Sequence, residues 1–230
     1  MSDFQRYAIY YAPRSGAFAE AAAEWLGRDP ATGRAVPQPD LPGLPRALAG
    51  LTGAPRRYGF HGTIRAPFRL GKELTEAMVQ QAVAGLARRL APVRMAGLGL
   101  HRLGGFLALT PEGDDAALIA LGAEVVRALD PLRAPLTPAE VARRRPDNLT
   151  ERQRELLARW GYPYVMEEFR FHLTLSDDLP PDEARALGAV AAEFFAPVLP
   201  QPFAVEDLCI FAEDGAGLFH LIGRHPLTGG

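Results

Sequence analysis

Cysteine, lysine and long apolar runs are scarce in this chain of 230 residues. The single cysteine, Cys209, has no partner for an intrachain disulfide, and the sequence holds no Cys-x-x-Cys or Cys/His pattern typical of zinc sites. We therefore expect a reducing compartment, the cytoplasm, and a fold that uses neither a metal ion nor another cofactor. No stretch reaches the roughly 18 apolar residues of a membrane span, and the first residues do not resemble a signal peptide, so no membrane contact is expected.

An excess of either charge is also absent. The 25 basic and 27 acidic residues give a net charge of −2, which disfavours a long nucleic-acid footprint or an anionic membrane as partner. Any contact with a polyanion must then be local. Only one basic residue, Lys72, is a lysine. We attribute the run Arg143-Arg144-Arg145 to this arginine-rich composition, so that it carries little information about a site.

Glycine and proline, by contrast, are abundant and dispersed, with 23 and 21 residues. This composition predicts many turns and no low-complexity segment. Five of the prolines lie in the segment 28–45, which cannot hold a regular element and is predicted to be a surface loop. The loop is long enough to act as a lid, and the sequence leaves that role open.

Hydrophobic periodicity and turn residues predict a mixed α+β chain. Strands are predicted over residues 4–12, 58–68, 93–102, 106–110, 169–176, 203–212 and 218–224. Helices are predicted over residues 15–26, 73–90, 114–129, 149–160 and 181–195, with an irregular segment over 131–146.

Two of the predicted strands, YGFHGTIRAPF and FRFHLTLS, carry the same motif. Each contains Phe-His-x-Thr followed by Ile or Leu. Because alternate residues of a strand project to one face, His61 projects with Thr63, and His172 projects with Thr174. The two motifs are the first candidates for a functional site.

The spacing around these motifs also repeats. His61 precedes the predicted hairpin glycine Gly104 by 43 residues, and His172 precedes Gly215 by the same distance. Each unit has the order strand, helix, hairpin, which predicts two lobes related by a pseudo-two-fold axis. Such an axis would bring the two motif strands face to face.

Two imidazoles and two hydroxyl groups suit chemistry at a phosphodiester. Imidazoles titrate near neutral pH, so one can act as a base while the other acts as an acid, and hydroxyl groups can hydrogen-bond the phosphate oxygens. Metal-dependent and covalent alternatives are less well supported. The remaining histidines show no metal-ligand spacing, no Gly-x-Ser-x-Gly motif is present, and Cys209 lies in an apolar strand where a buried, inert thiol is expected.

These motifs resemble those of the 2H phosphoesterase superfamily, named for two His-x-Thr/Ser motifs on the inner strands of a bilobal α+β fold. The wider segments RYAIYYAP, YGFHGTIRAPFRL and RWGYPYVMEEFRFHLTLS resemble the branch associated with phosphonate metabolism, whose function is unknown (DUF1045-like). The resemblance implies one bilobal domain over 1–230, with two pseudo-symmetric lobes of antiparallel sheet, helices on the outer faces and a central cleft. The motif regions of the lobes are 58–129 and 169–224.

The resemblance also implies roles for particular residues. His61 and His172 would be the acid–base pair, and Thr63 and Thr174 would bind the scissile phosphate. Two arginines beside the motifs are further candidates for binding substrate, with Arg65 as a candidate ligand of a second phosphate, and four tyrosines near strand ends are candidates for lining the pocket. These residues are Arg65, which stands where a lysine is usual, Arg170, Tyr7, Tyr58, Tyr162 and Tyr164.

The expected activity is metal-independent hydrolysis of a small cyclic phosphate by a monomeric enzyme, with 5-phosphoribosyl 1,2-cyclic phosphate as the substrate that the association with phosphonate metabolism suggests. Two alternatives stay open. One is an enzyme acting on RNA ends that carry a 2′,3′-cyclic phosphate, as a phosphodiesterase or in a ligase-like reaction. The other is a module that binds a nucleotide or phosphosugar without turnover. The sequence does not assign which histidine is the base.

Overall fold

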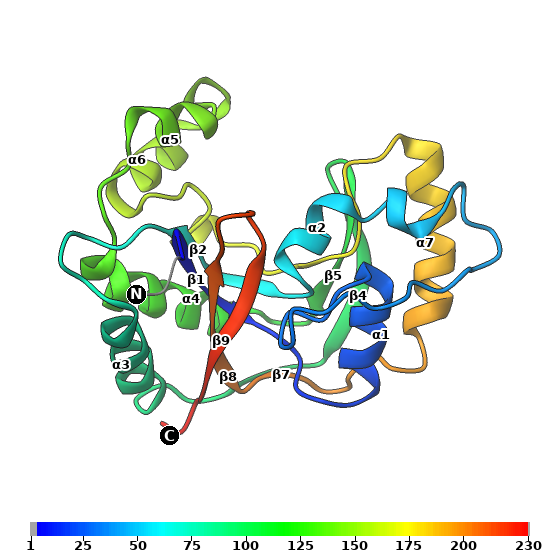
Figure 1. Ribbon diagram of the computed structural model, residues 1–230, viewed down its shortest axis with the longest axis horizontal. Coiled ribbons are helices and arrows are strands. Elements are labelled where there is room, and N and C mark those ends of the chain that lie inside the picture. Colours follow the sequence, from blue (N-terminus) through cyan, green and yellow to red (C-terminus); the bar gives the residue numbers. More distant parts are fainter. Residues whose placement is uncertain (1–3, 230) are drawn as a thin grey trace.

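The computed structural model describes residues 4–229 (Figure 1). The strands are β1 (Arg6–Tyr11), β2 (Gly62–Phe68), β3 (Val93–Met95), β4 (Gly97–Leu103), β5 (Phe106–Glu112), β6 (Leu173–Thr174), β7 (Phe203–Val205), β8 (Asp207–Glu213) and β9 (Phe219–Pro226). The α-helices are α1 (Ala17–Leu26), α2 (Gly53–Tyr58), α3 (Glu76–Ala87), α4 (Ala116–Leu129), α5 (Pro138–Arg143), α6 (Glu151–Trp160) and α7 (Pro181–Phe195). Short 3₁₀ turns are η1 (Leu48–Gly50), η2 (Asp130–Leu132), η3 (Pro146–Asn148) and η4 (Met166–Glu168).

The two motif strands lie side by side at the centre of one seven-stranded antiparallel sheet, in the order β4-β5-β6-β2-β1-β8-β9. They are joined through the single pair Gly62↔Leu173. The predicted face-to-face arrangement is therefore wrong, because the strands are neighbours in one ladder. Each half of the sheet combines both copies of the repeat. The β4–β5 hairpin follows the first motif in sequence yet lies beside the second, whereas β8 and β9 lie on the side of the first (Figure 1).

A second, two-stranded sheet joins equivalent strands of the two repeats. Strands β3 and β7, each of which leads into a hairpin, pair with each other in antiparallel orientation, with Val93 opposite Val205. Pairing of equivalent segments from the two repeats is what a pseudo-two-fold axis between them requires. The predicted fold class, a bilobal α+β fold built on antiparallel sheet, is confirmed.

Helices cover the outer sides of both halves. Helix α3 packs against β8 and β9, α4 packs against β2 and β3, and α7 packs against β4 and β5. Figure 1 shows α3 and α4 beside one half of the sheet and α1 and α7 beside the other. The longest helix, α7, has 15 residues, and within residues 4–229 no helix has both the length and the apolar character that a membrane crossing requires.

An insertion between α4 and β6 separates the two repeated units. It contains helices α5 and α6, at the top left of Figure 1. Both helices begin with a capping box, formed by Thr137 with Glu140 and by Thr150 with Gln153. Gly161 ends α6 at φ 76°, a conformation that glycine adopts without a steric cost. These caps fix a compact pair of helices in a region that the sequence predicted as partly irregular.

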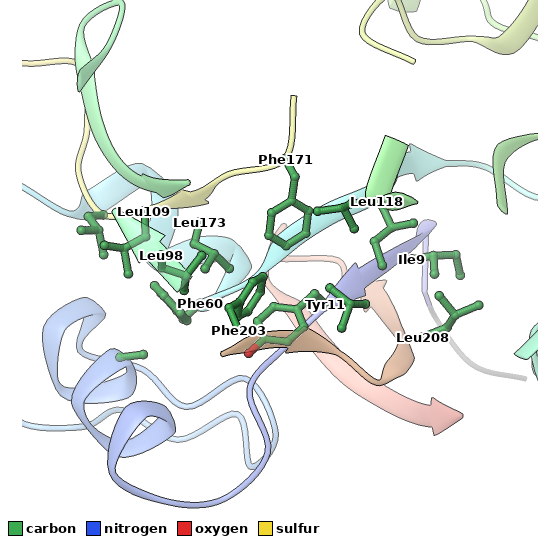
Figure 2. Packing of buried hydrophobic residues seen from close by; sticks show 14 of the residues in the cluster. Ile9, Tyr11, Phe60, Leu98, Leu109, Leu118, Phe171, Leu173, Phe203 and Leu208 are labelled. Carbon is green, nitrogen blue, oxygen red and sulfur yellow. The ribbon is translucent and has the colours of Figure 1, made fainter. Parts of the chain in front are cut away.

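Three aromatic rings of the buried core pack against the motif strands on the face away from the histidines (Figure 2). The ring of Phe203 lies 5.0 Å from that of Tyr11 and 5.9 Å from that of Phe171, between ring centroids. Tyr11 of β1 is paired with Gly62 of β2, and Phe171 immediately precedes His172. A Cβ atom on Gly62 would lie only 2.2 Å from Phe171 Cζ, so the glycine makes room for this ring.

The predicted strands 93–102 and 203–212 are each divided between the two sheets, and the boundaries predicted for both motif strands are wrong. Tyr58 is the last residue of α2, an unpredicted helix, and β2 begins only at Gly62. Of the strand predicted over 169–176, only Leu173 and Thr174 are in the ladder. The segment before them contains η4, where Met166 has φ 55°. Both motif strands are therefore entered from irregular chain, which places each histidine one residue outside its strand.

The proline-rich segment 28–45 packs onto the body of the protein. Arg28, which is buried, donates a hydrogen bond to the carbonyl of Phe219 (2.7 Å), and Pro30 accepts one from Leu221 N (3.0 Å). No residue of this segment lines the cavity that contains the motif histidines. The position of the loop gives no support to a role as a lid.

Replacing Gly62 with alanine tests the packing behind the motif strands. We expect Gly62→Ala to lower the free energy of unfolding by about 1–3 kcal/mol, because the new methyl group overlaps the Phe171 ring. Urea unfolding measures this loss. Gly215→Ala is the matched control, since nothing lies within 4 Å of its Cβ position, and it should change stability by less than about 0.5 kcal/mol. An equal loss in both variants would contradict the steric explanation.

Candidate active site

The ladder between β2 and β6 arranges the two motifs as a compact array. Gly62 is opposite Leu173, so extending the antiparallel register by one residue in each direction places His61 opposite Thr174 and Thr63 opposite His172. Residues opposite each other project to the same face. The four side chains therefore form a two-by-two array on one face, with the histidines on one diagonal and the threonines on the other, and all four line one cavity of about 390 Å³.

The same hydrogen bond orients each imidazole. His61 Nδ1 lies 2.8 Å from the carbonyl oxygen of Gly59, and His172 Nδ1 lies 2.8 Å from that of Arg170. A carbonyl oxygen only accepts, so Nδ1 carries the proton in both rings. In the neutral state Nε2 then has a free lone pair, and in the protonated state it donates. Each ring thus presents Nε2 for proton transfer.

The surroundings of the two imidazoles differ. The Tyr10 ring stacks on His61 at 4.0 Å between centroids, and the rings of Tyr58 and Phe211 lie at 5.6 and 6.3 Å. This enclosure removes part of the water around the half-buried ring, and loss of hydration together with the nearby His172 lowers the pKa of His61 to about 4. Around His172 a single aromatic ring, that of Phe106, lies at 5.6 Å. His61 is therefore neutral at physiological pH.

The cavity contains most of the predicted site. His61, Thr63, His172 and Thr174 line it, and so does Tyr58. Tyr162, another of the candidate tyrosines, also contributes. The remaining lining residues are Arg6, Tyr10, Ala54, Pro55, Ala66, Pro67, Phe106, Arg144, Ser176, Asp177 and Asp178.

Arg65 is not on the histidine face, contrary to the strict alternation assumed from the sequence. Thr63 pairs with Tyr10, but Arg65 pairs with Ile9, so the register shifts by one residue between them. Such a bulge turns the following side chain to the other face. Arg65 is buried there, and its guanidinium donates to the carbonyl of Val126 on α4 (2.5 Å).

Three more candidates do not line the cavity that contains the histidines. Arg170 is exposed and donates hydrogen bonds to the carbonyls of Glu167 and Phe169, at 3.1 and 2.8 Å. Tyr164 is 45% exposed and contacts the edge of the Tyr162 ring. Tyr7 on β1 is buried in the core and also does not line the cavity. The structure therefore does not place these three candidates among the residues that line the histidine cavity.

Sequence reasoning missed Tyr10, Arg6 and Arg144. Tyr10 and Arg6 are four residues apart in β1, so alternation places both side chains on one face of the strand. Only the pairing with β2 shows that this is the face that holds the histidines. Arg144 comes from the end of α5, far from either motif in sequence. It belongs to the arginine run 143–145, whose attribution to composition the structure corrects.

Within residues 4–229, no group of three or more His, Cys, Asp or Glu side chains is arranged as metal ligands would be. The carboxylates among the residues that line the cavity are those of Asp177 and Asp178. Asp177 accepts hydrogen bonds from Gly53 N and Ala54 N, at 3.0 and 2.6 Å, and so fixes the start of α2 beside the cavity.

The chain is a bilobal α+β protein that carries two His-x-Thr motifs on neighbouring strands. It belongs to the family described as protein of unknown function (DUF1045), which it matches over residues 63–220.

Two curated relatives share the name ribose 1,5-bisphosphate phosphokinase PhnN. The protein from Janthinobacterium sp. (strain Marseille) is 40% identical over 218 residues, which cover 92% of this chain and 48% of that protein. The protein from Laribacter hongkongensis (strain HLHK9) is 39% identical over 213 residues, which cover 92% of this chain and 49% of that protein. The chain thus spans about half the length of these curated relatives.

Solved structures with a similar fold include a phosphoesterase that is 18% identical, with a TM-score of 0.44 and coverage of 97% of this chain and 99% of that chain. E. coli LigT complexed with 3′-AMP is 16% identical, with a TM-score of 0.43 and coverage of 99% of each chain.

The low pKa of His61 gives a testable pH dependence. In the unfolded chain a histidine binds its proton below pH about 6.5, whereas folded His61 binds it only near pH 4. Unfolding therefore takes up a proton between these values, so the contribution of His61 to stability is present above pH 6.5 and is lost as the pH falls. We expect this loss to be about 1–3 kcal/mol between pH 7 and pH 4.

Two measurements check this expectation. NMR titration of the imidazole signals should give His61 a midpoint near pH 4. In parallel, urea unfolding of the wild type and of His61→Gln should show a smaller decrease in stability towards pH 4 for the variant. A His61 midpoint near 6.5 would show that the aromatic enclosure does not exclude water from the ring.

Proposed function

We propose that the protein is a metal-independent cyclic phosphodiesterase that hydrolyses a small cyclic phosphate by general acid–base catalysis. The observation that carries this proposal is the array of His61, Thr63, His172 and Thr174, in which both imidazoles hold Nδ1–H on a carbonyl and leave Nε2 available. Two Nε2 atoms on a diagonal can serve opposite sides of a phosphorus atom bound between them.

The different surroundings of the imidazoles suggest their roles. His61, neutral at physiological pH, accepts a proton from water at Nε2 while the water oxygen forms a bond to phosphorus. His172, protonated at Nε2, donates that proton to the leaving ester oxygen as the P–O bond breaks. The hydroxyls of Thr63 and Thr174 donate hydrogen bonds to the non-bridging oxygens, where negative charge develops. One water is consumed, and exchange with solvent restores both protonation states.

A phosphorylated ribose is the substrate class that we favour. The curated relatives are named for a phosphokinase of ribose 1,5-bisphosphate. Hydrolysis of 5-phosphoribosyl 1,2-cyclic phosphate at its 2-oxygen yields a ribose with phosphates at positions 1 and 5, which is the compound in that name. A role in phosphonate metabolism, suggested by the family resemblance, is consistent with this chemistry.

The kinase reaction itself is not proposed for this chain. A phosphate-binding loop of the type Gly-x-x-x-x-Gly-Lys-Ser/Thr needs a lysine followed by Ser or Thr, and the single lysine, Lys72, is followed by Glu73. Since the chain spans about half of each named relative, the activity in the name need not belong to the matched half.

The test of the proposed function is phosphorus NMR of the purified protein with a panel of cyclic phosphates in the presence of a chelator. We expect turnover of 5-phosphoribosyl 1,2-cyclic phosphate, with a bell-shaped dependence of rate on pH. His61→Gln and His172→Gln should each lower kcat by about 10²- to 10⁴-fold, because each removes one proton transfer. Reaction in ¹⁸O-labelled water should place one ¹⁸O atom in the product phosphate.

His101→Gln is the matched control, since His101 is exposed on β4 and contacts Thr110 outside the cavity. Its rate should equal that of the wild type. Turnover confined to oligonucleotides with a 2′,3′-cyclic end would favour the RNA alternative. Binding without hydrolysis of any member would favour the non-catalytic module, and loss of activity in the chelator would contradict metal independence.

A further inference from the structure

A second cavity, of about 300 Å³, adjoins the one with the histidines and is rich in arginine. Helix α5 and its C-terminal residues form one wall, strand β2 another, and Trp160 at the end of α6 a third. Seven of its lining residues are arginines, and one, Glu140, is acidic. The arginines are Arg6, Arg57, Arg65, Arg69, Arg133, Arg143 and Arg144.

Nearby carboxylates neutralise only part of this charge. Three carboxylates contact four of the seven arginines, which leaves an excess of four positive charges. The pairs are Arg6 with Glu213, Arg69 with Glu140, and Arg65 and Arg133 with Asp130.

The other three arginines, Arg57, Arg143 and Arg144, form no ion pair with any residue in the described range 4–229. Arg144 lies over the ring of Tyr162, at 4.8 Å from its centroid. In addition, Arg65 Nε is buried and lacks a hydrogen-bond partner among the described residues. Unpaired guanidinium groups at a common cavity repel one another, and an anion in the cavity would relieve this repulsion.

The two cavities share part of their lining. Six residues line both of them, among which Arg6 and Arg144 carry charge and Tyr58 and Tyr162 carry phenol groups. A ligand that places one group between the histidines can therefore extend past these four side chains towards the arginines.

We propose that the arginine-rich cavity binds a second, non-reacting phosphate of the substrate, in the form of a terminal phosphomonoester. This inference rests on the proposed function, since it assigns the reacting phosphate to the histidine cavity. A phosphomonoester is close to a dianion at neutral pH and offers three acceptor oxygens, which match the fork of donors on each guanidinium group. The residues of the site that are free of ion pairs, Arg57, Arg143 and Arg144, are the expected ligands.

A pair of matched substrates tests the inference. In the wild type, 5-phosphoribosyl 1,2-cyclic phosphate should have a lower KM than ribosyl 1,2-cyclic phosphate, which lacks the terminal phosphate. Arg143→Gln should raise the KM of the first about tenfold, as expected for loss of one hydrogen bond to a charged group, with little change in kcat. The KM of the second should be unchanged, because Arg143 lines only the arginine-rich cavity.

Arg145→Gln is the matched control. This substitution removes the same charge from the same segment as Arg143→Gln. Because Arg145 lines neither cavity, KM should stay at the wild-type value for both substrates. A rise in KM for both substrates in Arg143→Gln, or an equal rise in Arg145→Gln, would overturn the assignment of a specific phosphate site.

A binding measurement separates this inference from the proposed function. Ribose 5-phosphate is titrated into the full-length His172→Ala variant while the fluorescence of Trp160, which lines the cavity, is recorded. Saturable binding that is weakened about tenfold by adding Arg143→Gln, and not by adding Arg145→Gln, would support the phosphate site even if no cyclic phosphate were hydrolysed. Equal affinity for ribose and ribose 5-phosphate would overturn it. The proposal would also be overturned if only cyclic-ended oligonucleotides bound in a way that depends on Arg143. That result would indicate that the cavity binds an RNA backbone.

Discussion

The geometry of the site depends on one ladder pair between the two motif strands. Gly62 and Leu173 form the single contact in register between β2 and β6, and the Phe171 ring occupies the space that a side chain on Gly62 would fill. Because the ladder is antiparallel, this one pair relates the motifs by a local two-fold axis. The arrangement of two histidines on one diagonal and two threonines on the other follows directly from it.

The neighbouring strands then break this symmetry. Thr63 pairs on its outer side with Tyr10 of β1, whereas the equivalent Thr174 pairs with Ala108 of β5. A phenol ring at one position reaches over His61, and a methyl group at the other leaves the second imidazole uncovered on that side. The insertion of β1 between β2 and β8 thus gives two histidines of identical motif different surroundings, with the Tyr10 ring stacked on His61 and the Phe106 ring farther from His172. In the proposed reaction one ring accepts a proton and the other donates one.

The sequence predicted the features that depend on local pattern. It did not predict which face of the sheet a side chain occupies, or which side chains meet, where these depend on pairing between distant strands. The motifs, the hairpin turns at Gly104 and Gly215 and most helices follow from periodicity and turn residues. Alternation alone, however, placed Arg65 with Thr63, because a bulge is a property of the pairing with β1 and leaves no mark in the sequence of β2 itself. The contact of Tyr10 with His61 was equally hidden, since it joins residues 51 positions apart.

The arginine run at 143–145 shows why composition is a weak guide to a charged site. A net charge of −2 averages over the chain and gives no sign that seven arginines and one carboxylate line the same cavity. Only the fold of α5, begun by its capping box, separates Arg143 and Arg144, which line the cavity, from Arg145, which does not.

This separation of charge also suits the chemistry. In the proposed reaction, positive charge at the non-reacting phosphate would contribute binding energy equally before and during the reaction, whereas the hydroxyl groups and imidazoles at the reacting phosphate would respond to the charge that develops there.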